Sequence, residues 1–146
     1  MTTGEGPRDG AAAWREERRE AAAAHERALV ARQRAESEAA GVLIAAFLER
    51  ARVDGPPPVP LRALSYDRRR RFRTPLEGWY LRRDGAVGVD TDGRFYVLTA
   101  PTSLAALVRG VRPEPSPPPL VIGAGGRDGD SIDLADALER VLTGEG

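Results

Sequence analysis

The spacing of apolar residues divides the chain into a helical first third and a strand-rich remainder. From Ala11 to Val53 nearly every residue is a good helix former. In the second half of this stretch, apolar residues recur at three- and four-residue spacing: Ala40, Leu43, Ile44, Phe47, Leu48 and Ala51. Asp54-Gly55 and the three prolines that follow end the predicted helix, because glycine suits a C-terminal cap and proline cannot continue a helix. We therefore expect a long helix whose second half packs on a folded domain, with Gly41 favouring a bend near the middle.

The first half of this helix has few side chains to bury. Leu29 and Val30 are the only leucine, isoleucine, valine or phenylalanine residues before residue 40. We expect residues 1–10 to form a disordered tail, residues 11–40 an exposed helical arm, and residues 41–146 a single small domain. Heptad spacing relates Val30, Gln33, Ser37, Ala40, Ile44, Phe47 and Ala51. A self-paired coiled coil, a partner-binding arm and a solvated, partly frayed helix all fit this pattern.

After the prolines, apolar and polar residues alternate with the two-residue period of β-strands. Arg62–Tyr66 is a candidate first strand. Three later runs alternate more cleanly: Gly78–Arg83, Ala86–Thr91 and Arg94–Ala100. Asp84-Gly85 and Asp92-Gly93 separate these runs and suit two-residue hairpins, in which both central residues have positive φ. The pattern predicts an antiparallel β-meander.

The two faces of the predicted meander differ in composition. One face carries Trp79, Leu81, Val87, Val89, Phe95 and Val97. The other face carries Tyr80, Arg82, Arg94, Tyr96 and Leu98. We expect the first face to form the core and the second half of the long helix to cover it.

The C-terminal part predicts two further helices and one short strand. Ser103–Arg109 is typical of a short helix that Gly110 closes, and Leu120–Ile122 follows a proline-rich stretch as a strand. Asp133–Leu142 predicts the last helix, with Asp133 and Asp136 at capping-box spacing. The fold class we expect is α+β: a small antiparallel β-meander packed against a long N-terminal helix and a C-terminal helix.

The composition removes several kinds of enzyme chemistry. All 22 basic residues are arginine, and the chain has no lysine and no cysteine. Schiff-base, thiolate and Walker-lysine chemistry, and zinc sites built on cysteines, therefore have no residue to carry them. The formal net charge is zero, so no whole-molecule field draws the protein to nucleic acid or to an acidic membrane. This composition weighs against an enzyme.

The sequence carries no targeting or membrane signal. The segment MTTGEGPRDG has neither the basic start nor the apolar centre of a secretory signal. The longest apolar stretch, residues 39–48, has about ten residues where a membrane-spanning helix needs about 20. We expect a cytoplasmic protein that does not contact a membrane.

A cluster of arginines is the sharpest local feature. Residues 61–83 hold eight arginines and two acidic residues, a local net charge of +6. Guanidinium groups bind phosphates and aromatic rings stack on bases, so this segment is a candidate nucleic-acid-binding surface. The residues assigned to it are Arg68, Arg69, Arg70, Arg71, Arg73, Trp79, Tyr80 and Arg82. The alternative is a solvated loop in a chain that uses arginine in place of lysine.

Acidic and glycine-rich segments provide weaker candidates. The loop Gly123–Ser131 lies between a predicted strand and a predicted helix, where glycine-rich loops bind phosphate. It lacks the Walker lysine, and Asp128 stands where the dinucleotide-binding pattern has glycine, which favours a capping loop. A hydrolase that uses Asp90, Asp92, Asp128 and Asp130 has no convergent motif to support it. We therefore assign no catalytic residue, no cofactor and no metal site.

Three sequence segments resemble a group of bacterial proteins. They are GWYLRRD from Gly78, DGRFYVL from Asp92 and DGDSIDLADAL from Asp128. These segments, in this order, are similar to segments of short uncharacterised proteins of high-GC actinobacteria. The resemblance implies a bacterial cytoplasmic protein, and it carries no activity, cofactor or site residue.

Two functional hypotheses follow from the sequence. The first is a non-catalytic interaction or adaptor protein whose N-terminal helix mediates dimerisation or docks an unknown protein partner. The alternative is a nucleic-acid-binding accessory protein that uses the basic and aromatic residues around Arg68–Arg73.

Overall fold

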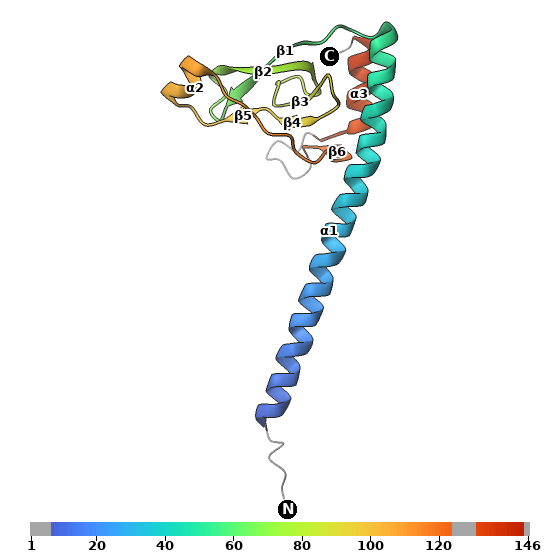
Figure 1. The fold of residues 1–146 in the computed structure, drawn as a ribbon, viewed down its shortest axis with the longest axis vertical. Helices are drawn as coiled ribbons and strands as arrows, with labels where there is room; N and C mark the ends of the chain where they lie inside the picture. Colours follow the sequence, from blue (N-terminus) through green and yellow to red (C-terminus); the bar gives the residue numbers. More distant parts are fainter. Residues whose placement is uncertain (1–6, 124–130, 145–146) are drawn as a thin grey trace, which may run out of the picture. The chain divides into compact units, whose positions relative to one another are not determined.

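The computed structural model describes residues 7–123 and 131–144 (Figure 1). Its elements in chain order are α1 (Pro7–Asp54), β1 (Val59–Ser65), β2 (Arg71–Tyr80), β3 (Val87–Asp90), β4 (Phe95–Val97), β5 (Thr99–Ala100), α2 (Leu104–Arg109), β6 (Val121–Ile122), β7 (Ile132–Asp133) and α3 (Leu134–Thr143). A long N-terminal helix, a five-stranded sheet and a C-terminal helix confirm the α+β class. The chain forms two compact units: the first ends at Ala35 and the second begins at Glu36.

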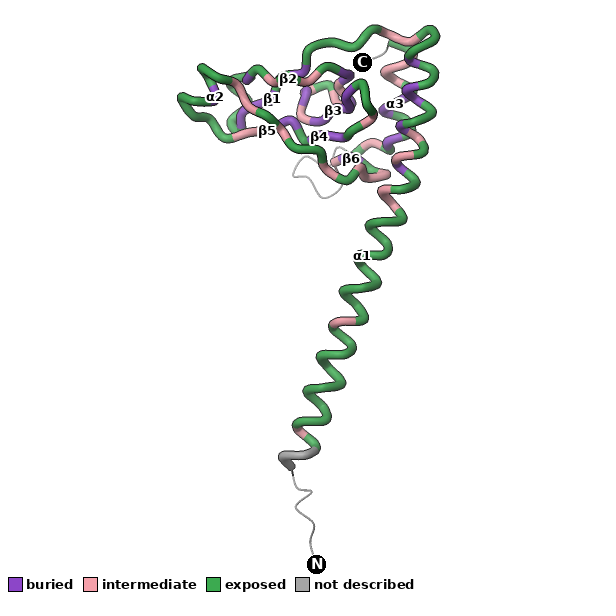
Figure 2. The backbone as a smooth tube through the Cα atoms, viewed as in Figure 1, coloured by how far each residue is buried: buried purple, intermediate pink, exposed green. Residues whose placement is uncertain are grey.

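The first unit is the N-terminal part of α1. The helix begins at Pro7, four residues before the predicted Ala11, and proline is well suited to a first helical position. Residues 1–6 of the predicted tail lie outside the described residues. Nearly all side chains from residue 10 to 35 are exposed, as the green stretch of α1 in Figure 2 shows. This part of the helix therefore rests on the helix propensity of its alanines, arginines and glutamates.

The second unit begins with the remainder of α1. This part of the helix buries one face, made of Ala40, Ile44, Phe47, Leu48 and Ala51, as the sequence predicts. The helix runs without interruption through Gly41 to Asp54. It ends where predicted: the backbone N–H of Gly55 donates to the Ala51 carbonyl at 3.1 Å, and the prolines follow.

The five strands form a sheet whose two edges meet at one residue. The strand order is β4-β3-β2-β1-β5, antiparallel throughout except for the parallel pair β1 and β5. Leu98 lies between β4 and β5. Its N–H donates to the Ala86 carbonyl at 2.8 Å, and its carbonyl accepts from the N–H of Leu64 at 2.7 Å. The sheet is therefore curled, and the predicted strand Arg94–Ala100 is divided between its two edges.

The hairpin turns differ from those predicted. Gly85 N–H donates to the Arg82 carbonyl, and Gly93 N–H donates to the Asp90 carbonyl, each at 3.0 Å. Both glycines have positive φ, 77° and 86°, whereas the preceding aspartates do not. Each turn is thus a four-residue turn closed by a left-handed glycine, and the prediction of two positive φ values was wrong. A turn of this kind also reverses the chain direction in a hairpin, and it uses one more loop residue than the predicted two-residue loop.

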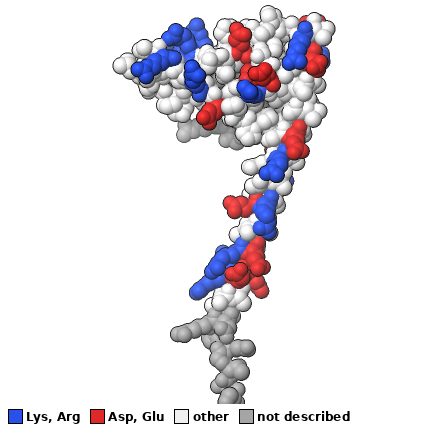
Figure 3. Space-filling view, viewed as in Figure 1, with Lys and Arg blue, Asp and Glu red and all other residues white. Residues whose placement is uncertain are grey.

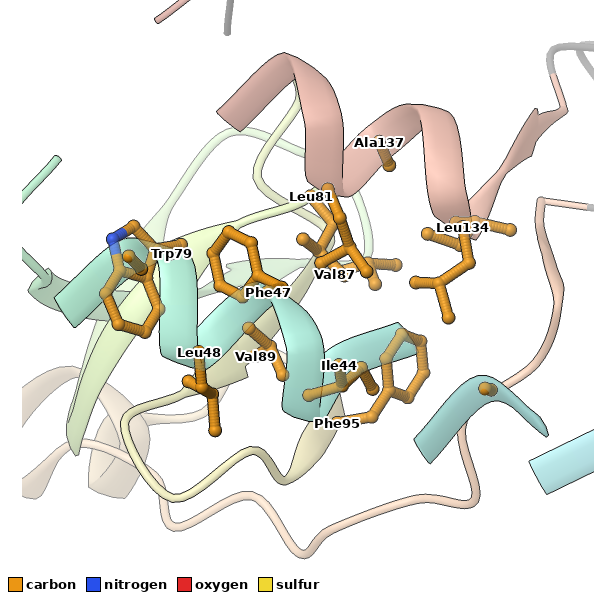
Figure 4. Close-up of a cluster of buried hydrophobic side chains, with 14 residues drawn as sticks. Ile44, Phe47, Leu48, Trp79, Leu81, Val87, Val89, Phe95, Leu134 and Ala137 are labelled. Atoms are coloured by element: carbon orange, nitrogen blue, oxygen red, sulfur yellow. The ribbon is translucent and has the colours of Figure 1, made fainter. Parts of the chain in front are cut away.

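The predicted core face is confirmed. Trp79, Leu81, Val87, Val89 and Phe95 are buried together with α1 and α3. Figure 4 shows Ile44, Phe47 and Leu48 of α1 beside these sheet residues, with Leu134 and Ala137 of α3 completing the cluster. Val97, the last residue assigned to this face, is 47% exposed.

The opposite face of the sheet is buried as well, which the sequence pattern did not predict. Tyr96 and Leu98 pack with Leu61 of β1 in a second cluster inside the curl. A third cluster joins Phe72 to Ala106 of α2. Alternation along a strand identifies two faces but does not show that a curled sheet covers both.

The short helices are capped in different ways. The Ser103 side chain accepts from Ala106 N–H at 3.0 Å and Gly110 closes α2, as predicted. The capping box predicted at Asp133 is wrong, because this side chain makes no capping hydrogen bond. The first N–H of α3, that of Leu134, instead donates to the Leu120 carbonyl at 2.8 Å beside the β6–β7 pair.

Candidate functional site

The turn between β1 and β2 carries most of the arginine run. Ser65 and Arg68 close it, since Arg68 N–H donates to the Ser65 carbonyl at 2.9 Å. The Asp67 carboxylate accepts from the Ser65 hydroxyl at 2.6 Å and from Arg69 N–H at 3.0 Å. These two hydrogen bonds, that from Ser65 first, lower the pKa of Asp67. The turn is therefore held by serine, aspartate and backbone groups, which leaves the arginine side chains at the surface.

The arginines of the run are all exposed but belong to different elements. Arg68, Arg69 and Arg70 lie in the turn, whereas Arg71 and Arg73 lie in β2 on either side of the buried Phe72. Figure 3 shows basic side chains gathered over the end of the domain near α2. Arg73 is directed to α2, where a guanidinium N–H donates to the Val108 carbonyl at 2.6 Å.

The two aromatic residues assigned to the nucleic-acid surface have structural positions. Trp79 is 7% exposed; its indole N–H donates to the Pro56 carbonyl at 2.9 Å, and its ring meets Phe47 edge-on with the centroids 5.2 Å apart. It lies on the core face, so it is not placed to stack on a base. Tyr80 is half-buried, and its hydroxyl accepts from the backbone N–H of Arg62 at 2.8 Å.

The structure brings four members of the predicted set, Arg68, Arg71, Tyr80 and Arg82, together with two arginines that the sequence analysis did not single out. Two cavities of about 380 and 540 Å³ share three lining residues: Arg82, Arg83 and Arg140. The smaller cavity also contacts Arg71, Tyr80, Leu81, Gly85, Ala137 and Val141. The larger cavity also contacts Arg68, Asp84, Ser131 and Ile132. We call this site the arginine pocket, defined by Arg68, Arg71, Arg82, Arg83 and Arg140.

Within residues 7–123 and 131–144, one carboxylate, that of Asp84, lines the arginine pocket. It forms ion pairs with Arg68 at 3.1 Å and with Arg82 at 3.4 Å. Desolvation acts to raise the pKa of Asp84, but hydrogen bonds from Ala86 N–H and from the two arginines outweigh it, and the pKa is lowered. Asp84 is therefore ionised at neutral pH and offsets part of the positive charge.

Arg71, Arg83 and Arg140 form no ion pair with a carboxylate of the described residues. Arg71 donates to the backbone carbonyl of Asp84 at 3.3 Å, which is a neutral acceptor. The Nε atom of Arg140 is buried and has no hydrogen-bond partner among the described residues. A buried donor without an acceptor is energetically costly.

The acidic residues considered for hydrolysis do not converge. Asp90 is 5% exposed, and its carboxylate accepts from Asp92 N–H, Arg94 N–H and the Tyr96 hydroxyl, each at 2.9 Å. Asp92 is exposed, and Asp128 and Asp130 lie outside the described residues. Within residues 7–123 and 131–144, no three histidine, aspartate or glutamate side chains lie close enough to hold a metal ion. The contacts of Asp90 give it a structural role in its hairpin.

Arg140 carried no signal in the sequence. It lies in α3 next to the core residues Ala137 and Leu138, and only the packing of α3 beside the β2–β3 turn brings it to Arg82 and Arg83. A contact between residues so far apart in the chain cannot be deduced from spacing within one helix.

The chain was compared with family models, curated proteins and solved structures, and none of them matched. No helix in the described part of the chain combines the length and the apolar character that crossing a membrane requires.

Proposed function

We propose that this chain is a non-catalytic interaction protein of the cytoplasm that forms a homodimer through the exposed part of α1. The observation that carries the proposal is the exposure of this helix. From residue 10 to 35 its side chains are almost all in solvent, including Trp14 at 56% exposure. A long helix with exposed apolar residues gains stability when a second helix covers them.

The heptad register suggested by the sequence cannot serve this dimer along its whole length. Its last four members, Ala40, Ile44, Phe47 and Ala51, are buried in the core of the second unit. A pairing surface must therefore use other residues or stay within the first unit.

The first unit offers a seam of alanines at alternating three- and four-residue spacing. Its members are Ala21, Ala24, Ala28, Ala31 and Ala35, and all five are exposed. Trp14 lies seven residues before Ala21 and so falls at the same heptad position. Because alanine has the smallest apolar side chain, two such seams bring helix backbones close together and extend dispersion contacts along their length. We call these five residues the alanine seam.

The mass of the full chain in solution tests the homodimer, with two substitutions of the same kind as probe and control. Ala28→Glu places a charge on the alanine seam, whereas Ala22→Glu places the same charge on another face of the same helix. By analytical ultracentrifugation we expect a dimer for the wild type and for Ala22→Glu, and a monomer for Ala28→Glu. A monomeric wild type at about 100 μM would exclude a dimer with a dissociation constant far below that concentration.

The nucleic-acid hypothesis is the second candidate, and Arg69 and Arg70 favour it. Their side chains are exposed and make no hydrogen bond or ion pair with the described residues. With Trp79 in the core, such binding would rest on phosphate contacts and would not depend on base sequence.

The affinity of the full chain for a labelled random single-stranded oligonucleotide tests this second candidate. If the arginines contact phosphates, affinity falls about tenfold or more between about 50 and 200 mM salt. Arg69→Ser with Arg70→Ser should weaken binding, whereas Arg15→Ser with Arg34→Ser, on the exposed part of α1, serves as a control of equal charge change. No salt-dependent binding, or equal effects of the two pairs, would remove the nucleic-acid hypothesis.

A further inference from the structure

We infer that the arginine pocket binds a small phosphorylated molecule, with the phosphate group held by the guanidinium groups. This inference is independent of the proposed homodimer, because none of the pocket residues belongs to the first unit. Guanidinium groups hold phosphate through paired, charge-assisted hydrogen bonds, and clusters of arginine are a common way to recognise it.

The charge balance of the pocket calls for an anion. Of the described residues, five arginines line the two cavities with one carboxylate, that of Asp84. That carboxylate is already occupied: Oδ1 accepts from Ala86 N–H at 3.0 Å, and Oδ2 pairs with Arg68 and Arg82. Arg83 and Arg140 form no ion pair with a described residue, and like charges repel one another, so an anion bound between these two side chains relieves that repulsion.

Two arginines are positioned to meet the ligand directly. The Arg83 side chain is exposed and makes no hydrogen bond or ion pair within the described part of the chain. Arg140, on α3, likewise makes no side-chain hydrogen bond or ion pair with the described residues. Both residues line both cavities, so the phosphate group is expected at the boundary between them.

The shape of the pocket favours a small molecule over a polymer. The cavities lie beside α3 and the β2–β3 turn and measure about 380 and 540 Å³, the size range of small-ligand sites. The larger cavity is mainly polar, with Arg68, Asp84 and Ser131, while the smaller also has Leu81 and Val141 in its wall. The phosphate at the boundary is therefore expected to face the polar cavity, and an apolar or planar organic part belongs in the smaller cavity, against Tyr80 and Val141.

Titration of the full chain with pyrophosphate at constant ionic strength, followed by calorimetry, tests the phosphate part of this inference. We expect saturable binding with a dissociation constant of about 1 mM or tighter. Arg83→Gln should weaken it by about tenfold, the usual effect of losing one charge-assisted contact. Arg112→Gln removes the same charge from an exposed residue outside the pocket and should leave the affinity unchanged.

A second variant, in another element, checks that the loss of affinity comes from the pocket and not from misfolding of one variant. Arg83 is exposed and makes no hydrogen bond or ion pair with the described residues, so Arg83→Gln is expected to fold normally, which circular dichroism verifies. Arg140→Gln should also weaken pyrophosphate binding, although Arg140 lies in a different element. Absence of saturable binding by the wild type, or equal affinities of wild type, Arg83→Gln and Arg140→Gln, would overturn the inference.

Comparison of adenosine monophosphate, inorganic phosphate and adenosine tests the organic half of the pocket. If the nucleoside contacts Tyr80 and Val141, the monophosphate binds more tightly than phosphate, and adenosine alone binds weakly. A monophosphate that binds no more tightly than phosphate contradicts the proposed organic contact. Binding only to an oligonucleotide, with loss on substitution of Arg69 and Arg70, contradicts the small-molecule ligand and favours nucleic acid.

Discussion

Single residues in this protein differ sharply in how much change their surroundings allow, and two glycines show the range. A Cβ atom at Gly78 would lie 1.9 Å from the carbonyl oxygen of Val89 on the neighbouring strand, whereas a Cβ at Gly41 would meet nothing within 4 Å. Gly78→Ala should therefore cost about 3 kcal/mol or more, because β2 and β3 cannot approach. Gly41→Ala should raise the free energy of unfolding by about 0.5–1 kcal/mol, because alanine favours the helix.

Urea denaturation of the two glycine variants beside the wild type measures both changes. Opposite signs are the expected result. Equal stabilities of wild type and Gly78→Ala would show that the two strands are farther apart than described here.

The buried carboxylate of Asp90 supports a second prediction at the residue scale. The Tyr96 hydroxyl donates to it at 2.9 Å, and both residues are buried. Tyr96→Phe removes this hydroxyl donor and leaves one oxygen of the Asp90 carboxylate buried without a hydrogen bond from Tyr96. This change should lower the free energy of unfolding by about 1–3 kcal/mol. Val97→Thr, on the exposed neighbour, should change it by less than about 0.5 kcal/mol in a chemical denaturation experiment.

The same tyrosine predicts a loss of stability at alkaline pH. Desolvation, and then the hydrogen bond to Asp90, raise the pKa of Tyr96. The folded state therefore keeps this proton where the unfolded state begins to lose it. The resulting stabilisation is complete below the ordinary tyrosine pKa of about 10 and is lost as pH rises above it. Between about pH 9 and pH 11, the unfolding temperature should fall more for the wild type than for Tyr96→Phe. Equal falls would argue against the raised pKa.

At the scale of elements, α1 belongs to the folded domain only in part. Residues 36–54 carry the buried face and the Glu36 carboxylate, which accepts from Leu120 N–H at 2.9 Å. A chain that begins at Ala35 should therefore unfold at nearly the same temperature as the full chain. A chain that begins at Leu43 lacks both Ala40 and this acceptor, and should lose about 2 kcal/mol or more. Differential scanning calorimetry compares the three; a large loss on removal of the first 34 residues would contradict two separate units.

The elements differ in how well the sequence predicts them, and the reasons are local. The end of α1, the short helix α2 and the core face of the meander follow from periodicity, glycine and proline. The start of β2 does not: Arg71 and Arg73 look like loop residues, yet they flank the buried Phe72 in a strand. The capping of α3 does not follow from local sequence either, because the N–H of Leu134 donates to the carbonyl of Leu120, outside this helix.

The candidate site was predictable only where its residues are neighbours in sequence. Arg68 and Arg82 were assigned from local charge and do line the arginine pocket, but Trp79 was assigned from the same pattern and lies in the core. The two-residue alternation that puts Trp79 on the same strand face as Leu81 already predicted a core position. For Trp79 this periodicity was a better predictor of burial than the nearby arginines were of nucleic-acid binding. The position of Arg140 depends on tertiary packing and has no local signature.

At the scale of the whole molecule, the two proposed activities use separate residues. The alanine seam lies within residues 21–35, and the arginine pocket lies within residues 68–140. Ala28→Glu should therefore abolish the dimer and leave pyrophosphate affinity unchanged, while Arg83→Gln should do the reverse. Ultracentrifugation and calorimetry on both variants test this independence. A coupled loss of both properties in either variant would show that dimerisation and ligand binding depend on each other.

The curled sheet also limits how this protein can assemble. An open sheet exposes the N–H and carbonyl groups of its outer strands, to which another chain can add by hydrogen bonding. Here Leu98 hydrogen-bonds toward both edges, and Ser116 N–H donates to the Phe95 carbonyl at 2.8 Å on the outer side of β4. Ser116 lies among prolines, which have no N–H to offer an incoming strand. Growth of fibres by strand addition is thus disfavoured at this edge. Pairing through the exposed part of α1 lets two chains associate without opening the sheet.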